Sequence, residues 1–262
     1  MQVNDPFARS LRLRRLSRHD AGGLLVVPLD HAVAAGPLAG RGDLDSLVAG
    51  IAENGADAVV LHKGAVRRVH PRRFQQMSLI LQLNAGTSLG ADPDAKYPVA
   101  TVEEALRLGA QAVSVQVNAA SLTEDRQVAH LAAVAGSCDR WGIPLLAMMY
   151  VRGPEIVDRT APALVAHALA IASELGADLV KTALPESEPA IAELTARCPV
   201  PVLAAGGEVD GPATVLGRLA AAVRAGAGGI AAGRLVFTAD DPGAMVRRLA
   251  TLVHDRTPAA VR

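Results

Sequence analysis

A short pattern, Gly-Ala-x-x-(Val/Ile), occurs four times along the chain, as Gly55-Ala-Asp-Ala-Val59, Gly109-Ala-Gln-Ala-Val113, Gly176-Ala-Asp-Leu-Val180 and Gly226-Ala-Gly-Gly-Ile230. Each copy follows a helix-like stretch and opens an apolar run. Glycine is favoured where a helix ends because it adopts a positive φ at little cost. Since the spacings of 54, 67 and 50 residues each correspond to about two strand-plus-helix units, the pattern predicts a regular alternation of strands and helices.

Four further apolar runs lie between these copies, so that strands are predicted over 24–28, 58–61, 79–83, 112–117, 145–149, 179–180, 202–205 and 229–232. Most are continuously hydrophobic, as parallel strands buried on both faces are. Helices are predicted over 43–54, 124–141, 161–175, 187–197, 212–225 and 242–254. We therefore expect an α/β protein with a (β/α)8 TIM barrel. A doubly wound nucleotide-binding fold is disfavoured, because the glycines of 226–229 precede a strand rather than follow one.

The composition fits one domain over 1–262, with a helical extension over 1–20 that covers one end of the fold. The 26 basic and 26 acidic residues cancel, which argues against nucleic acid as a partner. No apolar run is long enough for a membrane span, and the arginine-rich segment 7–19 lacks the apolar region of a secretory signal. Cys138 and Cys198 show no motif spacing, so we expect both to be reduced and buried in a cytoplasmic protein.

Only three of the 26 basic residues are lysines, namely Lys63, Lys96 and Lys181. An arginine keeps its proton near neutral pH, whereas a desolvated lysine can lose it and attack a ketone. Lys181 ends a predicted strand, so its side chain should enter an apolar barrel; an ion pair with Asp30 or Glu208 is the alternative. Lys63 ends another strand and is expected to anchor substrate or to form a salt bridge. Lys96 is expected on the surface.

Other polar residues also end predicted strands, where barrels of this kind carry their chemistry. Tyr150 can relay protons there, or it can be a buried tyrosine with a hydrogen-bond partner. Asp30 is suited to ion pairing, metal binding or acid–base chemistry. His31 and His62 are metal ligands in principle, but no metal-binding spacing accompanies them, so no metal is expected.

Two glycine-containing loops follow the last two predicted strands, at Gly206-Gly207 and Gly233-Arg234. Loops at these places commonly bind phosphate through backbone N–H groups, and an arginine can add a bidentate contact. Ordinary tight turns are the alternative explanation. The presence of both loops favours a phosphate site.

Several motifs occur in one order, namely Pro28-Leu-Asp-His31, Leu61-His-Lys-Gly64, Ala147-Met-Met-Tyr-Val-Arg-Gly153, Val180-Lys-Thr182, Ala205-Gly-Gly207 and Gly233-Arg234. With them the chain resembles the archaeal-type class I aldolases over about residues 20–255. The resemblance implies that Lys181 forms the Schiff base, with Tyr150 as proton donor and Asp30 as proton acceptor. The substrate- or phosphate-binding residues that we expect are His31, Lys63, Arg152, Gly206, Gly207, Gly233 and Arg234.

The resemblance implies an aldol reaction without a cofactor, in which a lysine imine of dihydroxyacetone phosphate adds to a small aldehyde. Aspartate semialdehyde is the favoured acceptor; transaldolase-type synthesis of 2-amino-3,7-dideoxy-D-threo-hept-6-ulosonate and cleavage of fructose 1,6-bisphosphate are the alternatives. Alternatives of another class are a metal-dependent barrel lyase or isomerase that uses His31 and His62, and a binding protein on a retired barrel. The resemblance also implies a homo-oligomer, for which a ring-based assembly of ten is one form.

Overall fold

The computed structural model describes residues 7–17, 23–37, 43–207 and 211–255. Eight parallel strands close into a barrel in the spatial order β1-β10-β9-β8-β7-β6-β3-β2. Their bounds are β1 (Leu24–Pro28), β2 (Ala58–Leu61), β3 (Ser78–Gln82), β6 (Ala112–Ala119), β7 (Leu145–Val151), β8 (Leu179–Thr182), β9 (Val202–Ala205) and β10 (Gly229–Ala231). The predicted TIM barrel is confirmed.

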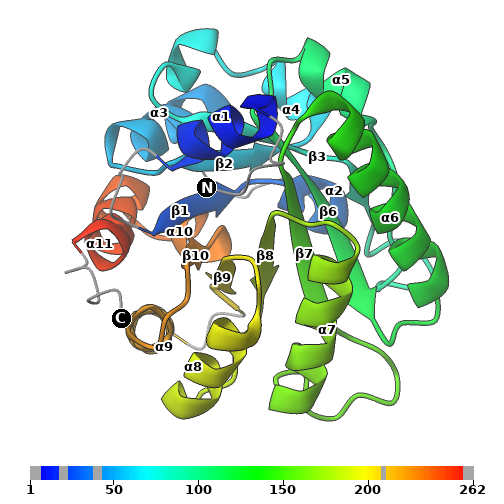
Figure 1. The fold of residues 1–262 in the computed structure, drawn as a ribbon. Helices are drawn as coiled ribbons and strands as arrows, with labels where there is room; N and C mark the ends of the chain where they lie inside the picture. Colours follow the sequence, from blue (N-terminus) through cyan, green and yellow to red (C-terminus); the bar gives the residue numbers. More distant parts are fainter. Residues whose placement is uncertain (1–6, 18–22, 38–42, 208–210, 256–262) are drawn as a thin grey trace.

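The helices surround this barrel (Figure 1). The longer ones are α3 (Leu44–Glu53), α6 (Glu124–Trp141), α7 (Pro162–Glu174), α8 (Glu188–Arg197), α9 (Pro212–Arg224) and α11 (Pro242–His254), each within one residue of its predicted bounds at either end. Shorter helices were not predicted, namely α2 (His31–Ala35), α4 (Lys63–Val66), η1 (Pro71–Phe74), α5 (Val102–Arg107) and α10 (Arg234–Phe237). No helix in the described ranges is long and apolar enough to cross a lipid bilayer.

The repeated glycines end helices as predicted, because Gly55, Gly109, Gly176 and Gly226 all have φ between 78° and 102°. The third position of the repeat has a second role. In three copies its side chain accepts a hydrogen bond from a backbone N–H of the neighbouring strand, at 2.7 Å for Asp57 to Leu25, 2.9 Å for Gln111 to Leu79 and 2.8 Å for Asp178 to Leu145. The repeat therefore both ends a helix and joins adjacent strands at the amino end of the barrel.

The barrel interior is filled by alternate residues of the strands, including Val26, Val60, Ile80 and Leu203. Helix α1 (Phe7–Leu16) covers the amino end of this interior, where Leu16 is only 1% exposed. Its arginines hold it in place: the Arg12 guanidinium donates to the Gly142 carbonyl at 2.6 Å, and Arg9 lies 3.5 Å from Asp178. The expected N-terminal capping helix is thus confirmed.

The two cysteines are both free. Burial raises the pKa of Cys138 to about 12. The prediction that both are buried is wrong for Cys198, which is half-buried because it stands at the C-terminal end of α8.

Barrel closure depends on the pairing of β1 with β10, in which Leu24 lies opposite Gly229. A Cβ on Gly229 would lie 2.1 Å from the Leu24 carbonyl oxygen. We expect Gly229→Ala to lower the free energy of unfolding by about 3 kcal/mol or more, since backbone atoms would have to separate. Urea denaturation would measure the change.

The matched control is Gly136→Ala in the exposed middle of α6, where a Cβ meets nothing within 4 Å. This substitution should raise stability by about 0.5–1 kcal/mol, because alanine is the better helix former. Equal effects of the two substitutions would contradict the steric account of the closure.

Candidate active site

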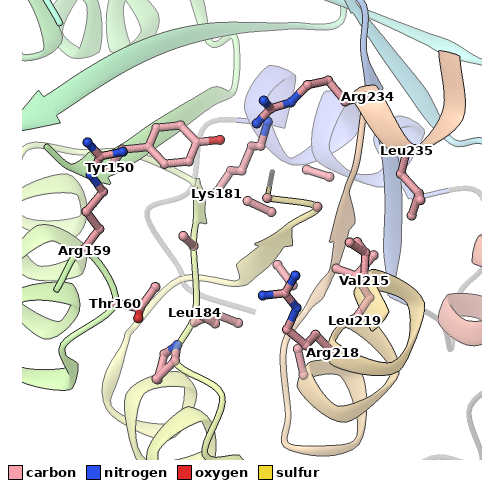
Figure 2. Close-up of a pocket in the computed structure, with 18 of the residues that line it drawn as sticks. Tyr150, Arg159, Thr160, Lys181, Leu184, Val215, Arg218, Leu219, Arg234 and Leu235 are labelled. Atoms are coloured by element: carbon pink, nitrogen blue, oxygen red, sulfur yellow. The ribbon is translucent and has the colours of Figure 1, made fainter. Parts of the chain in front are cut away.

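A cavity of about 350 Å³ opens at the carboxyl ends of β7, β8, β9 and β10. Most of the predicted site residues line it, namely His31, Tyr150, Arg152, Lys181, Gly206, Gly207, Gly233 and Arg234. Figure 2 shows Lys181 rising into this cavity between Tyr150 and Arg234. The structure therefore gathers residues that are more than 200 positions apart in the sequence.

Lys181 lies in β8, between Met148 of β7 and Leu203 of β9. Because side chains alternate along a strand, Lys181 shares the interior face with Leu179, and only 6% of it is exposed. No carboxylate of the described residues lies within 4.0 Å of the Lys181 amine, the distance limit for an ion pair. Glu208, one of the two proposed partners, lies outside the described residues. The observed position is that of a desolvated amine facing a cavity.

Tyr150 stands beside this amine. The Lys181 Nζ atom lies 5.9 Å from the centre of its ring, and the Arg152 guanidinium lies 5.0 Å from the same centre. The Arg152 guanidinium is attracted by the electron-rich face of the ring. The contacts fix the phenol next to the lysine, where its hydroxyl can move protons during imine chemistry.

Asp30 does not line the cavity itself, but it lies beside His31, which does. It precedes α2, its side chain is 15% exposed, and its Oδ1 lies 3.5 Å from Nδ1 of His31. Burial lowers the pKa of His31; Asp30 opposes this effect, whereas Lys181 and Arg234 add to it. The lowered pKa favours the neutral form of His31 near pH 7, and its ring lies within electrostatic reach of Lys181 and Arg234.

The two glycine loops line the cavity. Gly207 and Gly233 are required to be glycine for different structural reasons. Gly207 has a φ of 69°, a conformation that favours glycine. A Cβ on Gly233 would lie 2.1 Å from the Pro28 carbonyl oxygen and 2.9 Å from Cε1 of His31. Close packing against the end of β1 therefore requires Gly233 irrespective of any ligand. Together with Arg234, the loops still offer backbone and guanidinium donors to an anion.

The structure does not bring Lys63 to the cavity. Lys63 is exposed, and its amine lies 3.0 Å from Oε1 of Glu104. This ion pair is the second of the two roles left open by the sequence.

Lys96 was expected on the surface, and that expectation is wrong. Its side chain is half-buried, and burial lowers its pKa, with a further decrease from Arg152. Sequence reasoning missed this environment because it is formed by segments that are distant in the chain.

Three further polar residues line the cavity without having been predicted, namely Arg159, Thr160 and Arg218 (Figure 2). Arg218 comes from α9, and its guanidinium lies 3.7 Å from the Glu186 carboxylate. Arg159 and Thr160 lie in the loop before α7 and Arg218 lies in the middle of α9, and none of them belongs to a recurring motif, so no sequence signal marks them. Among the described residues, no three His, Cys, Asp or Glu side chains converge as a metal site would need.

The comparison with protein families matches residues 24–239 to the DeoC/LacD family of aldolases. This chain belongs to that family. The family match covers every strand of the barrel and the loops that line the cavity. It agrees with the class I aldolase resemblance drawn from the motifs, so the protein is an enzyme of the aldolase class.

Two relatives are similar to this aldolase over nearly its whole length. A Streptomyces griseus protein named 2-amino-4,5-dihydroxy-6-oxo-7-(phosphonooxy)heptanoate synthase is 53% identical over 256 residues, which is 97% of this chain and 93% of the relative. A Halobacterium salinarum protein named 2-amino-3,7-dideoxy-D-threo-hept-6-ulosonate synthase is 40% identical, over 94% of this chain and 92% of the relative.

Solved structures share the fold of this aldolase. An archaeal fructose 1,6-bisphosphate aldolase superposes with a TM-score of 0.82 at 30% identity, covering 95% of this chain and all of that structure. A second structure, described as such an aldolase with its catalytic lysine covalently bound to the carbinolamine intermediate, gives a TM-score of 0.81 at 30% identity, over 94% of this chain and 99% of that one.

Burial also lowers the pKa of His62, and Asp30 opposes this effect. In the pH interval between the usual histidine value of about 6.5 and the lowered value, the unfolded chain binds a proton that the folded chain does not. Stability should therefore fall as pH decreases through this interval. We expect His62→Gln to reduce the slope of the free energy of unfolding against pH, by at most about 1.4 kcal/mol per pH unit.

Urea denaturation at pH 7.5, 6.5 and 5.5 would measure the slope. The exposed His70 provides the matched control variant, His70→Gln. If His62→Gln and wild type had the same slope, the burial of His62 would not contribute to the pH dependence.

Proposed function

We propose that this aldolase forms a Schiff base between Lys181 and dihydroxyacetone phosphate and joins this donor to aspartate semialdehyde. The observation that carries the proposal is the buried Lys181 amine, 6% exposed, in a cavity that also contains Tyr150 and both glycine loops. The name of the Streptomyces relative supports the substrates. Its product has a ketone beside a phosphate at one end and an amino acid at the other, as condensation of these two compounds would give.

In the proposed mechanism, the neutral Lys181 amine attacks the ketone carbon of the donor. Tyr150 supplies the proton with which water leaves the carbinolamine, giving an iminium ion. The iminium withdraws electrons, so that Asp30 or Tyr150 can remove a proton from the neighbouring carbon. The resulting enamine attacks the aldehyde carbon of the acceptor, and hydrolysis of the new imine releases the product and Lys181.

The donor phosphate would bind to the loops that follow β9 and β10. Backbone N–H groups at Gly206, Gly207 and Gly233 can approach an anion closely, and Arg234 adds a charge-assisted contact. This arrangement supports the assignment of all four as phosphate-binding residues. His31, neutral near pH 7 and close to Lys181 and Arg234, is suited to a hydrogen bond with the donor.

A second candidate is the transaldolase-type reaction named for the Halobacterium relative. The higher identity of 53% to the Streptomyces relative favours the first candidate. Incubation with dihydroxyacetone phosphate and a panel of aldehydes, followed by mass spectrometry of the products, separates the two. The family resemblance also leads us to propose a cytoplasmic homo-oligomer, whose subunit number light scattering would measure.

Borohydride reduction tests the imine directly. With dihydroxyacetone phosphate and borohydride, the wild-type protein should gain covalent mass at Lys181. Lys181→Met should gain none, and its turnover should fall at least about 10³-fold. Covalent mass on another residue would contradict the mechanism, and loss of wild-type turnover with EDTA would favour the metal-dependent alternative.

Tyr150→Phe removes only the hydroxyl and keeps the ring that faces Lys181 and Arg152. We expect kcat to fall about 10²–10⁴-fold, because the proton relay is lost. Thermal unfolding of the variant should match wild type, which would separate the chemical effect from a structural one. A kcat within twofold of wild type would remove Tyr150 from the mechanism.

A further inference from the structure

A cluster of charged residues lies at the carboxyl rim beside Tyr150, formed by Lys96, Arg152, Asp92 and Asp94. The Arg152 guanidinium is 4.0 Å from Oδ1 of Asp94. The Lys96 amine is within electrostatic range of several charges: burial and Arg152 lower its pKa, while Asp94, Asp30 and Asp92 oppose this effect. We call these four residues the rim cluster. The mechanism above assigns no step to Lys96, Asp92 or Asp94.

Three members of the rim cluster, Asp92, Asp94 and Lys96, lie on one loop that is held by buried hydrogen bonds. Strands β4 (Asn84–Ala85) and β5 (Tyr97–Pro98) pair antiparallel at its base. The Asp94 carbonyl accepts hydrogen bonds from Nδ2 of Asn118 at 2.7 Å and from Nε2 of Gln127 at 3.0 Å, and both of these residues are fully buried. The main chain of the loop is therefore fixed against β6 and α6 independently of the Asp94 carboxylate.

The position of Lys96 is also fixed by packing. A Cβ on Gly86 would lie 2.1 Å from the Ala95 carbonyl oxygen and 2.9 Å from the Lys96 Nζ atom. The amine thus lies against the chain directly after β4 instead of extending into solvent. No carboxylate of the described residues lies within 4.0 Å of the Lys96 amine, the distance limit for an ion pair. A half-buried ammonium in this position needs an anion that the described chain does not supply at close range.

Among the described residues, one carboxylate oxygen of Asp92 lacks a hydrogen-bond donor, whereas the Lys96 amine lacks a close anion. The Asp92 Oδ1 atom accepts a hydrogen bond from the Asp94 N–H at 2.9 Å, whereas its Oδ2 is buried and has no hydrogen-bond partner in the described part of the chain. A buried carboxylate oxygen without a donor is unfavourable. The rim cluster therefore lacks both an anion near Lys96 and a donor near Asp92.

The barrel order places this cluster on one side of Lys181. Strand β8, which carries Lys181, lies between β7 and β9. The two glycine loops follow β9 and β10 on one side of Lys181, whereas Arg152 follows β7 on the other. A donor bound through its phosphate to the glycine loops would direct its reactive carbon toward Lys181, leaving the β7 side for the acceptor.

We propose that the rim cluster binds a zwitterionic α-amino acid whose side chain ends in an aldehyde. Lys96 and Arg152 would bind its α-carboxylate, and Asp92 and Asp94 would bind its α-ammonium group. The inference rests on the proposed function and identifies the residues that select its acceptor. It accounts for the opposite unmet needs of Lys96 and Asp92, because one ligand carries both complementary charges.

Lys96→Met tests the carboxylate contact. Its KM for aspartate semialdehyde should rise about 10–100-fold, as expected for loss of a charge-assisted hydrogen bond. Borohydride trapping with dihydroxyacetone phosphate should be unchanged, and so should kcat/KM for butanal, which carries neither charge. Lys96→Arg should restore part of the affinity. A parallel loss in donor trapping would overturn the inference, because Lys96 would then act on the donor.

Asp94→Asn tests the ammonium contact while it preserves the shape of the side chain and the main-chain carbonyl. It should raise the KM for aspartate semialdehyde about tenfold, with little change for succinate semialdehyde, which lacks the amino group. Equal changes for both aldehydes would overturn the role of Asp94.

L-Homoserine separates failure of this inference from failure of the proposed function, because it keeps both α-groups and has a hydroxyl in place of the aldehyde. If wild type is trapped by borohydride but does not use aspartate semialdehyde, the proposed acceptor is wrong. Calorimetric binding of L-homoserine that weakens at least tenfold in Lys96→Met would still support the rim cluster. Absent or equal binding would overturn it.

Discussion

The alternation of side chains along the strands of a closed barrel is the constraint on which this enzyme depends. Leu179 fills the interior of the barrel, so Lys181, two residues further along β8, must face the interior as well. A shift of one residue in the register would place Val180 inside and the lysine among the surrounding helices. The burial of the Lys181 amine thus follows from strand pairing.

The two ends of the barrel have different roles: residues at the amino end stabilise the fold, and residues at the carboxyl end surround the cavity. At the amino end, Asp57 and Asp178 hold neighbouring strands together, and α1 covers the interior. Asp57 also lies 2.8 Å from the His254 ring at the end of α11. At the carboxyl end, the basic side chains of Arg152, Lys181 and Arg234 gather around one cavity. The charges that would destabilise a barrel interior are thereby kept at the rim, above a layer of apolar side chains.

The sequence predicted the strands and the longer helices because their signals are local. An apolar run, a glycine at a helix end and the Asp241-Pro242 helix start, where the aspartate accepts a hydrogen bond from the Ala244 N–H, each lie within a few residues. It also placed Lys181 and Tyr150 at one rim. It failed for Lys96, whose surroundings come from Gly86 and Arg152, and it gave Gly233 a ligand-based reason where the Pro28 carbonyl provides a steric one. Such contacts between distant segments leave no pattern in the chain.

The scarcity of lysine has a practical consequence for handling the protein. Of its three side-chain amines, Lys181 is 6% exposed and Lys96 is half-buried, whereas 47% of the Lys63 side chain is accessible. An acylating reagent at limiting dose reacts first with the accessible side-chain amine. Among the side-chain amines, coupling would therefore favour Lys63, which lies outside the cavity that contains Lys181.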